Sequence, residues 1–169
     1  TKGTYDANSM SLVGATPFFL TVKGADITLM RLLIEHGADP KIGNSDETPP
    51  LFVAAGMGFI EGQVHATEAE ALEAVEILVG LGAEVTATNA RDETALHGAA
   101  YRGANNIVQY LVDRGADLWA KDDKDLLPVT IADGFRRGTG FSANDHTAAL
   151  LRELMGPDAP ERNTDQGAR

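Results

Sequence analysis

The four histidines, His36, His65, His97 and His146, are the side chains best suited to bind a metal or to move a proton. Zinc ligands must converge, often from positions i and i+4 of one helix, and no two of these histidines share a structural unit of the chain. The chain has no cysteine, which excludes disulfides, thiolate metal sites and a cysteine nucleophile. The sequence therefore predicts no metal site built on histidine or cysteine.

Three neighbouring carboxylates, Asp122, Asp123 and Asp125, are the next candidates, because calcium loops are rich in aspartate. A calcium loop that began at Asp123 would need glycine at its sixth position and glutamate at its twelfth. The chain has Pro128 and Gly134 at these positions. We therefore interpret the cluster as a solvated loop tip.

The glycines of Gly80-Leu81-Gly82 resemble a nucleotide-binding loop only weakly, because such a loop follows a strand and opens a helix. Here the glycines follow an apolar run with helical spacing and are expected to end a helix. No Gly-x-Ser-x-Gly, His-Glu-x-x-His or phosphate-binding lysine motif occurs. We expect no catalytic, cofactor-binding or metal-binding residues, and a protein that is not an enzyme.

Composition narrows the classes of partner. The formal net charge of -11 argues against nucleic acid, because a phosphate-binding surface needs clustered Lys and Arg. No run approaches the roughly 18 apolar residues of a membrane span, so no membrane insertion is expected. The sequence starts at Thr1 without a charged or apolar leader, so a processed, exported form stays open and the compartment is unknown.

A short block recurs three times, at spacings of 45 and 33 residues: Gly37-Ala38-Asp39, Gly82-Ala83-Glu84 and Gly115-Ala116-Asp117. A second block recurs at spacings of 33, 45 and 33 residues: Thr16-Pro17-Phe18, Pro49-Pro50-Leu51, Thr94-Ala95-Leu96 and Leu127-Pro128-Val129. Two independent markers thus agree on a period of 33 residues with 12 extra residues in the second unit. Such a period indicates a repeat architecture.

Each marker has a physical reason. Thr16 and Thr94 can cap a helix, because a threonine hydroxyl accepts from the first backbone N–H groups. Proline suits the first helical position, where its missing N–H costs nothing. Apolar residues spaced by three and four then predict a second helix in each unit. Gly37, Gly82 and Gly115 end that helix, since glycine adopts the left-handed conformation easily.

The pattern predicts an all-α chain with negligible strand content apart from hairpin-like finger loops. The expected helices span Pro17–Lys23, Ile27–His36, Pro50–Gly56, Glu68–Leu81, Ala95–Arg102, Asn106–Arg114, Val129–Asp133 and His146–Met155.

These blocks resemble the ankyrin repeat, which opens with Thr-Pro-Leu-His, continues with a leucine-rich run and closes with Gly-Ala-Asp. The cleanest copy runs from Thr94-Ala95-Leu96-His97 to Gly115-Ala116-Asp117. The resemblance covers about residues 10–156 and implies a solenoid of stacked helix pairs with projecting fingers. It also implies that His97 ties neighbouring repeats together, and that fingers and concave helices bind other proteins.

The repeats divide the chain into a lead-in (1–13), repeats at 14–46, 47–91 and 92–124, a degenerate terminal repeat (125–156) and a disordered tail (157–169). The second repeat lacks a capping Thr at Pro49 and carries an insertion near 59–71. Thr67 and Glu70 have the spacing of a capping box, so Phe59–Ala66 is expected to loop outward. A further insertion, around Phe135–Asp145, separates the last two helices.

The favoured function is a non-catalytic module that binds another protein. Trp119 stands where Lys41 and Thr86 stand in earlier units, and tryptophan is favoured at binding hot spots. We expect its ring to be exposed, although packing on the neighbouring finger is the alternative. The candidate contact residues are Asp46, Arg91, Asp92, Tyr101, Arg102, Trp119, Asp123 and Lys124.

The alternative is a structural subunit that stacks on further copies of itself into rings or filaments. The first repeat shows none of the polar substitutions that a terminal repeat needs, so its outer face is expected to be covered. The residues predicted to form this stacking face are Phe18, Phe19, Leu29, Met30 and Leu33.

Overall fold

The computed structural model describes residues 11–56, 66–134 and 143–162. In these ranges the chain forms eight α-helices, one short 3-10 helix (η1) and no strand beyond an isolated bridge between Thr88 and Thr94. The elements are α1 (Pro17–Lys23), α2 (Ile27–Glu35), α3 (Pro50–Ala55), α4 (Glu68–Gly80), α5 (Ala95–Arg102), α6 (Asn105–Asp113), α7 (Pro128–Ala132), α8 (Asp145–Met155) and η1 (Gly156–Asp158).

All eight predicted helices are confirmed, and no bound differs by more than one residue from the expectation. The predicted end glycines adopt the left-handed conformation, with φ of +86° at Gly37, +82° at Gly82 and +90° at Gly115. At the start of α1, the Thr16 hydroxyl accepts from the backbone N–H of Phe19 at 3.1 Å. The short sequence signals for helix ends were therefore sufficient to place the helices.

The capping box at the start of α4 is also confirmed. The Thr67 hydroxyl accepts from the Glu70 N–H at 3.2 Å, and the Glu70 carboxylate accepts from the Thr67 N–H at 2.8 Å. These hydrogen bonds lower the pKa of Glu70, because they stabilise its ionised form. By contrast α3, which begins after Pro49, has no side-chain cap.

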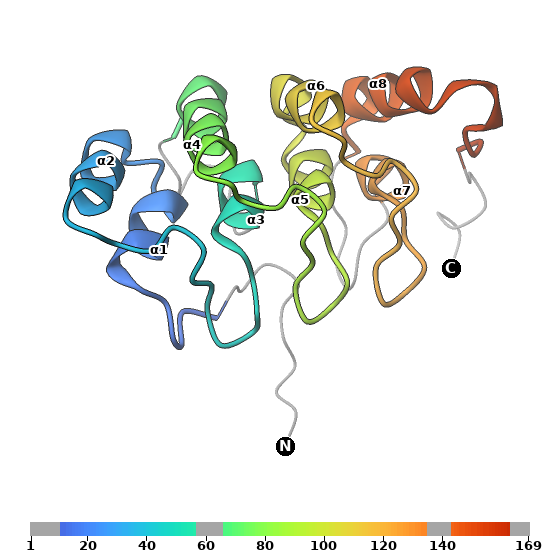
Figure 1. Ribbon diagram of the computed structural model, residues 1–169. Coiled ribbons are helices and arrows are strands. Elements are labelled where there is room, and N and C mark those ends of the chain that lie inside the picture. Colours follow the sequence, from blue (N-terminus) through green and yellow to red (C-terminus); the bar gives the residue numbers. More distant parts are fainter. Residues whose placement is uncertain (1–10, 57–65, 135–142, 163–169) are drawn as a thin grey trace.

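The helices pack in two rows (Figure 1). The odd-numbered helices α1, α3, α5 and α7 form one row, and the even-numbered helices form the other, with finger loops projecting beyond the odd-numbered row. Close approach within the first row depends on small residues, since Ala54, Ala55, Ala99 and Ala100 are at most 3% exposed. The predicted all-α solenoid is confirmed.

The far end of the array is held by Arg152 on α8. Its guanidinium donates to both carboxylate oxygens of Asp133, at 3.0 and 2.6 Å, and its Nε donates to the Pro160 carbonyl at 2.9 Å. Arg162 pairs with Asp145 at 3.0 Å. The predicted disordered tail is therefore wrong for residues up to 162, because these polar contacts hold the segment against α8.

Residues 163–169 and the greater part of both predicted insertions lie outside the described residues. The expectation that Phe59–Ala66 loops outward is among these, since only Ala66 of that segment is described.

Candidate functional site

Each finger loop is closed by one buried polar side chain. In the first finger, the Asn44 side-chain oxygen accepts from the backbone N–H groups of Asp46 and Thr48, at 3.1 and 2.9 Å. Asn89 and Asp122 occupy the same place in the next two fingers and accept from the residues two and four further along, at 2.8–3.1 Å. All three side chains are buried, so one residue sets the shape of each fingertip.

This geometry changes the interpretation of the aspartate cluster. Asp123 and Asp125 are exposed, as expected of a solvated tip, but Asp122 is only 5% exposed because its carboxylate holds the turn. Asparagine at the equivalent positions 44 and 89 was the signal for that role. In the described part of the chain, no group of three His, Asp or Glu residues is arranged to hold a metal ion.

Neighbouring fingers are joined to one another through their backbones. One such bond recurs at the same place in each unit: Ser45 N to Val13 O at 2.9 Å, Ala90 N to Asp46 O at 3.2 Å and Asp123 N to Arg91 O at 2.9 Å. The fingers consequently form one connected row rather than independent loops, and side chains on them keep fixed relative positions.

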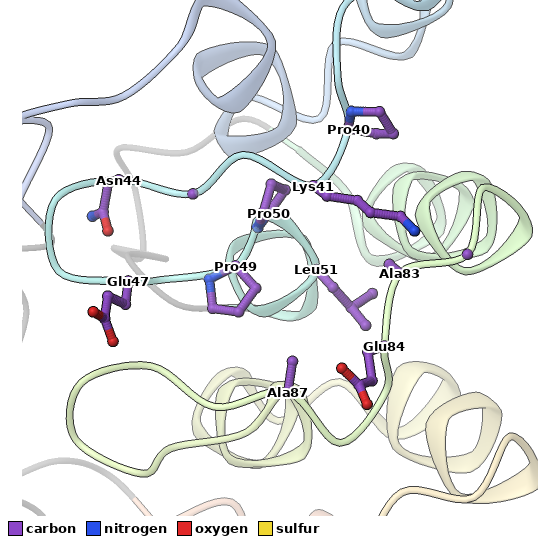
Figure 2. Close-up of a pocket in the computed structure, with 12 residues that line it drawn as sticks. Pro40, Lys41, Asn44, Glu47, Pro49, Pro50, Leu51, Ala83, Glu84 and Ala87 are labelled. Carbon is purple, nitrogen blue, oxygen red and sulfur yellow. The ribbon is translucent and has the colours of Figure 1, made fainter.

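A pocket with a volume of about 310 Å³ lies between the first finger and the start of the second (Figure 2). Its apolar lining comes from Pro40, Pro49, Pro50, Leu51, Ala83 and Ala87. Lys41, Glu47 and Glu84 add exposed charges, and Figure 2 shows Pro49 between the two carboxylates in this view. The pocket thus combines an apolar surface with charges of both signs, two of them negative.

Gly43 lies where the two sides of the first finger approach each other closely. A Cβ at position 43 would lie 2.4 Å from the Thr48 carbonyl oxygen, so the two sides of this finger approach too closely for a side chain. Thr88 and Lys121 stand at the equivalent places in the next two fingers. Because Gly43 also lines the pocket, the close approach of the two sides of this finger helps to define the pocket wall.

Most of the predicted contact residues lie on the finger row. Asp92, Trp119, Asp123 and Lys124 are exposed, whereas Asp46 and Arg91 are half-buried. The structure therefore brings these six residues to neighbouring fingers, although none of them lines the pocket. Sequence reasoning missed the pocket residues because their side chains come from two loops that are distant in the sequence.

Tyr101 is not a surface residue, and the prediction that it offers a contact is wrong. It is 7% exposed near the end of α5, and Asn144 Nδ2 donates to its backbone carbonyl at 3.1 Å. Arg102, the next residue, donates to the Ala66 carbonyl at 2.8 Å. Burial lowers the pKa of Arg102, and the hydrogen bond ties α5 to the segment before α4.

Trp119 is 46% exposed, as the sequence predicts. Its backbone N–H donates to the Asp117 carboxylate at 2.8 Å, which fixes the start of the third finger. Lys41 at the equivalent place in the first finger lines the pocket. Trp119 therefore presents a large apolar surface at a finger position that is polar in the other two.

The predicted stacking face needs correction. Phe18, Phe19 and Met30 are at most 2% exposed, because α1 and α2 turn these side chains into the core shared with α3 and α4. Leu33 is half-buried against the same core, and Leu29 is 39% exposed. The apolar side chains exposed beside Leu29 are Leu20, at 47%, and Leu32, at 48%.

His97 links two repeats, as the family resemblance implies. Its Nδ1 accepts from the Thr94 N–H at 3.1 Å, and the Thr94 hydroxyl lies 2.9 Å from the same nitrogen. Its Nε2 lies 3.1 Å from the Leu126 carbonyl oxygen of the next finger, which assigns the Nε2–H tautomer. With one nitrogen accepting and the other donating inside the core, His97 is structural.

The comparison with known families decides the identity of this fold. Residues 63–128 match the family described as ankyrin repeats (3 copies). The chain is an ankyrin-repeat protein. Ankyrin repeats generally mediate protein–protein interaction, and the family is typically non-catalytic.

Three curated relatives each align with most of this chain. Alpha-latrocrustotoxin-Lt1a of Latrodectus tredecimguttatus is 31% identical over 149 residues, which is 88% of this chain and 9% of the toxin. B-cell lymphoma 3 protein homolog of Mus musculus is 29% identical over 78% of this chain and 27% of its own length. A transient receptor potential cation channel subfamily A member 1 homolog of Caenorhabditis elegans is 27% identical over 71% of this chain and 9% of its own length. This ankyrin-repeat chain thus spans about a quarter or less of these relatives. Over the described ranges, none of its helices combines the length and apolar character needed to cross a membrane.

Proposed function

We propose that this chain is a recognition module that holds a partner protein on its finger row. The observation that carries the proposal is the pocket between the first and second fingers. Binding sites for small groups are typically concave and largely apolar, with a few placed polar groups that give orientation. This pocket has that composition, and hydrogen-bonded fingers hold its walls in place.

The charges favour a partner segment in which an apolar side chain is flanked by lysine or arginine. The apolar side chain would pack against Pro49 and Leu51, while its basic neighbours approach Glu47 and Glu84. The net charge of -11 also favours a positively charged partner, because complementary potentials accelerate association and exclude acidic competitors.

Reversing the pocket carboxylates is expected to weaken such binding. Peptides would be selected from a displayed random library on the immobilised chain, and their Kd measured with the Glu47→Lys/Glu84→Lys variant. We expect selected peptides rich in Lys or Arg beside an aliphatic residue, and a Kd raised about tenfold or more in the variant.

The control for this experiment is Glu76→Lys, a charge reversal at an exposed position of α4 away from the pocket, which is matched in charge to each pocket substitution made singly. Glu76→Lys should leave the Kd nearly unchanged, since it alters the net charge of the chain but no residue of the pocket. Peptides that bound equally well to the pocket variant, or that lost as much affinity with Glu76→Lys, would contradict a role for the pocket.

Trp119→Ala is expected to weaken partner binding at little cost in stability. The half-exposed ring makes the change in the free energy of unfolding small, about 0.5 kcal/mol. Loss of a tryptophan contact typically raises Kd by about tenfold or more. Thr86→Ala, at the same place in the second finger, is the control. A blue-shifted, buried tryptophan emission in a proven monomer would contradict the expectation.

Head-to-tail assembly of copies is the second candidate, because Leu20, Leu29 and Leu32 are exposed at the first end of the array. The contacts at the far end of the array disfavour head-to-tail assembly. Figure 1 shows the segment after α8 at the outer end, where Arg152 and Asp145 hold it through Pro160 and Arg162. A second copy that stacked there would have to displace these contacts, so we favour the recognition module.

A further inference from the structure

The first end of the array exposes apolar side chains at positions that other repeats bury. Leu29 is 39% exposed, whereas Ala74 and Ile107, its equivalents in the next two repeats, are fully buried. Leu20 is 47% exposed, whereas its equivalent Val53 is 5% exposed. Leu20 and Leu29 are therefore exposed because their repeat stands at the end of the row, and not because a different kind of residue occupies these positions.

In the second and third repeats, the preceding helix pair covers these positions. α3 packs on α1, α5 on α3, and in the other row α4 packs on α2 and α6 on α4. The exposed end, which we call the first-end face (Leu20, Leu29 and Leu32), continues these repeat-to-repeat interfaces. Its apolar character and its place in the row hence suit a helix pair of the same kind.

The residues before α1 form the second half of a finger. Gly14 has φ of +74°, and the residues that follow it at the repeat spacing, Glu47, Asp92 and Asp125, have φ of +57°, +59° and +62°. These three non-glycine residues adopt the left-handed conformation only because the fingertip turn requires it. The same backbone turn is therefore present ahead of the first helix pair.

The hydrogen bonds of this lead-in agree with that assignment. The Val13 N–H donates to the Ser11 hydroxyl at 3.2 Å, as the Asp46 N–H donates to Asn44 in the first finger. The Val13 carbonyl accepts from Ser45 at 2.9 Å, in the bond that joins later fingers. Residues 11–15, the half-finger, thus take the place that belongs to the finger of a preceding repeat.

We propose that the first-end face is the stacking interface for one more ankyrin-type helix pair, carried ahead of the half-finger in the same polypeptide. Continuity with the internal interfaces specifies a helix pair as the occupant. The half-finger specifies its connection, because in every described repeat the chain reaches such a turn from the preceding helix pair. A second copy of the chain would cover the leucines without accounting for the half-finger.

Adding a repeat in register tests the proposal. A copy of residues 92–121 would replace residues 1–10, so that Ser11 follows at the position of Asp122 and the 33-residue period is kept. We expect a single cooperative unfolding transition with a Tm raised by about 5 °C or more, because repeat stability grows through nearest-neighbour interfaces. Leu29→Glu in the extended chain should abolish this rise.

Leu81→Glu is the matched control, since Leu81 on the second repeat is exposed to the same 39% as Leu29. It should leave the rise intact, and a scrambled copy of residues 92–121 should produce none. Two separate transitions, or no rise with the native copy, would overturn the proposal. So would a concentration-dependent dimer of the parent chain that Leu29→Glu dissociates in light scattering, because it would assign the face to a second copy. Peptide binding to the finger pocket is measured independently of every one of these outcomes.

Discussion

Gly56→Ala is expected to destabilise the chain by about 2–4 kcal/mol, through overpacking and backbone strain together. Gly56 follows α3 with φ of +146°, a conformation that side chains oppose. An added Cβ would lie 2.6 Å from the Gly98 carbonyl oxygen and 2.7 Å from the Arg102 Cβ. Both neighbours belong to α5, so relief would require α3 and α5 to move apart.

Urea unfolding of Gly56→Ala beside Gly80→Ala would measure this effect. Gly80 ends α4, and a Cβ added there would meet nothing within 4 Å beyond its own helix backbone and its chain neighbours, so alanine reduces the backbone entropy of the unfolded chain without a clash. Gly80→Ala should be neutral or stabilising by up to about 1 kcal/mol. If Gly56→Ala and Gly80→Ala were equally stable, α3 and α5 would tolerate more separation than their contacts indicate.

The helices were predictable because their signals are local. Pro17 and Pro50 mark helix starts, and Gly37 marks an end through its own backbone conformation, whatever surrounds it. The spacing of apolar residues then assigns the segments between such marks to helices. None of these inferences needs knowledge of the neighbouring repeat.

Burial and the pocket depend on neighbours, and here the sequence was a weaker guide. Phe18 and Phe19 were assigned to an outer face, yet one helix pair alone does not show which of its sides the next repeat covers. Tyr101 is only 7% exposed, and its backbone carbonyl accepts from Asn144, which lies 43 residues further along the chain. Gly43 lines the pocket and leaves no room for a side chain beside Thr48. Its difference from Thr88 and Lys121 was a signal in the sequence that could have drawn attention to this finger.

His97 is expected to make the stability of the chain fall as the pH drops below about 6.5, the ordinary histidine value. Burial is the largest influence and lowers the pKa of His97, against the opposing effects of the Leu126 carbonyl and of the charges on Glu93 and Asp122. Because the folded pKa lies below the unfolded value, the unfolded chain binds the proton first. This contribution to stability is therefore complete above the unfolded pKa and is lost as the pH falls towards the folded pKa.

The geometry explains why protonation is unfavourable in the fold. His97 Nδ1 accepts from the Thr94 N–H, and a proton on that nitrogen would remove the acceptor from a buried donor. Urea unfolding between pH 8 and pH 5 should show the loss, at no more than about 1.4 kcal/mol per pH unit for one proton.

His97→Phe is the informative variant, because Phe19 and Phe52 fill the equivalent places in the first two repeats. It should lose stability at pH 8, by about 1–3 kcal/mol, since Thr94 and Leu126 would be left with buried polar groups. It should also have a shallower dependence on pH below about 6.5 than the wild-type chain. If His97→Phe and the wild-type chain lost stability in parallel as the pH fell, the acid sensitivity would have to arise from groups other than His97.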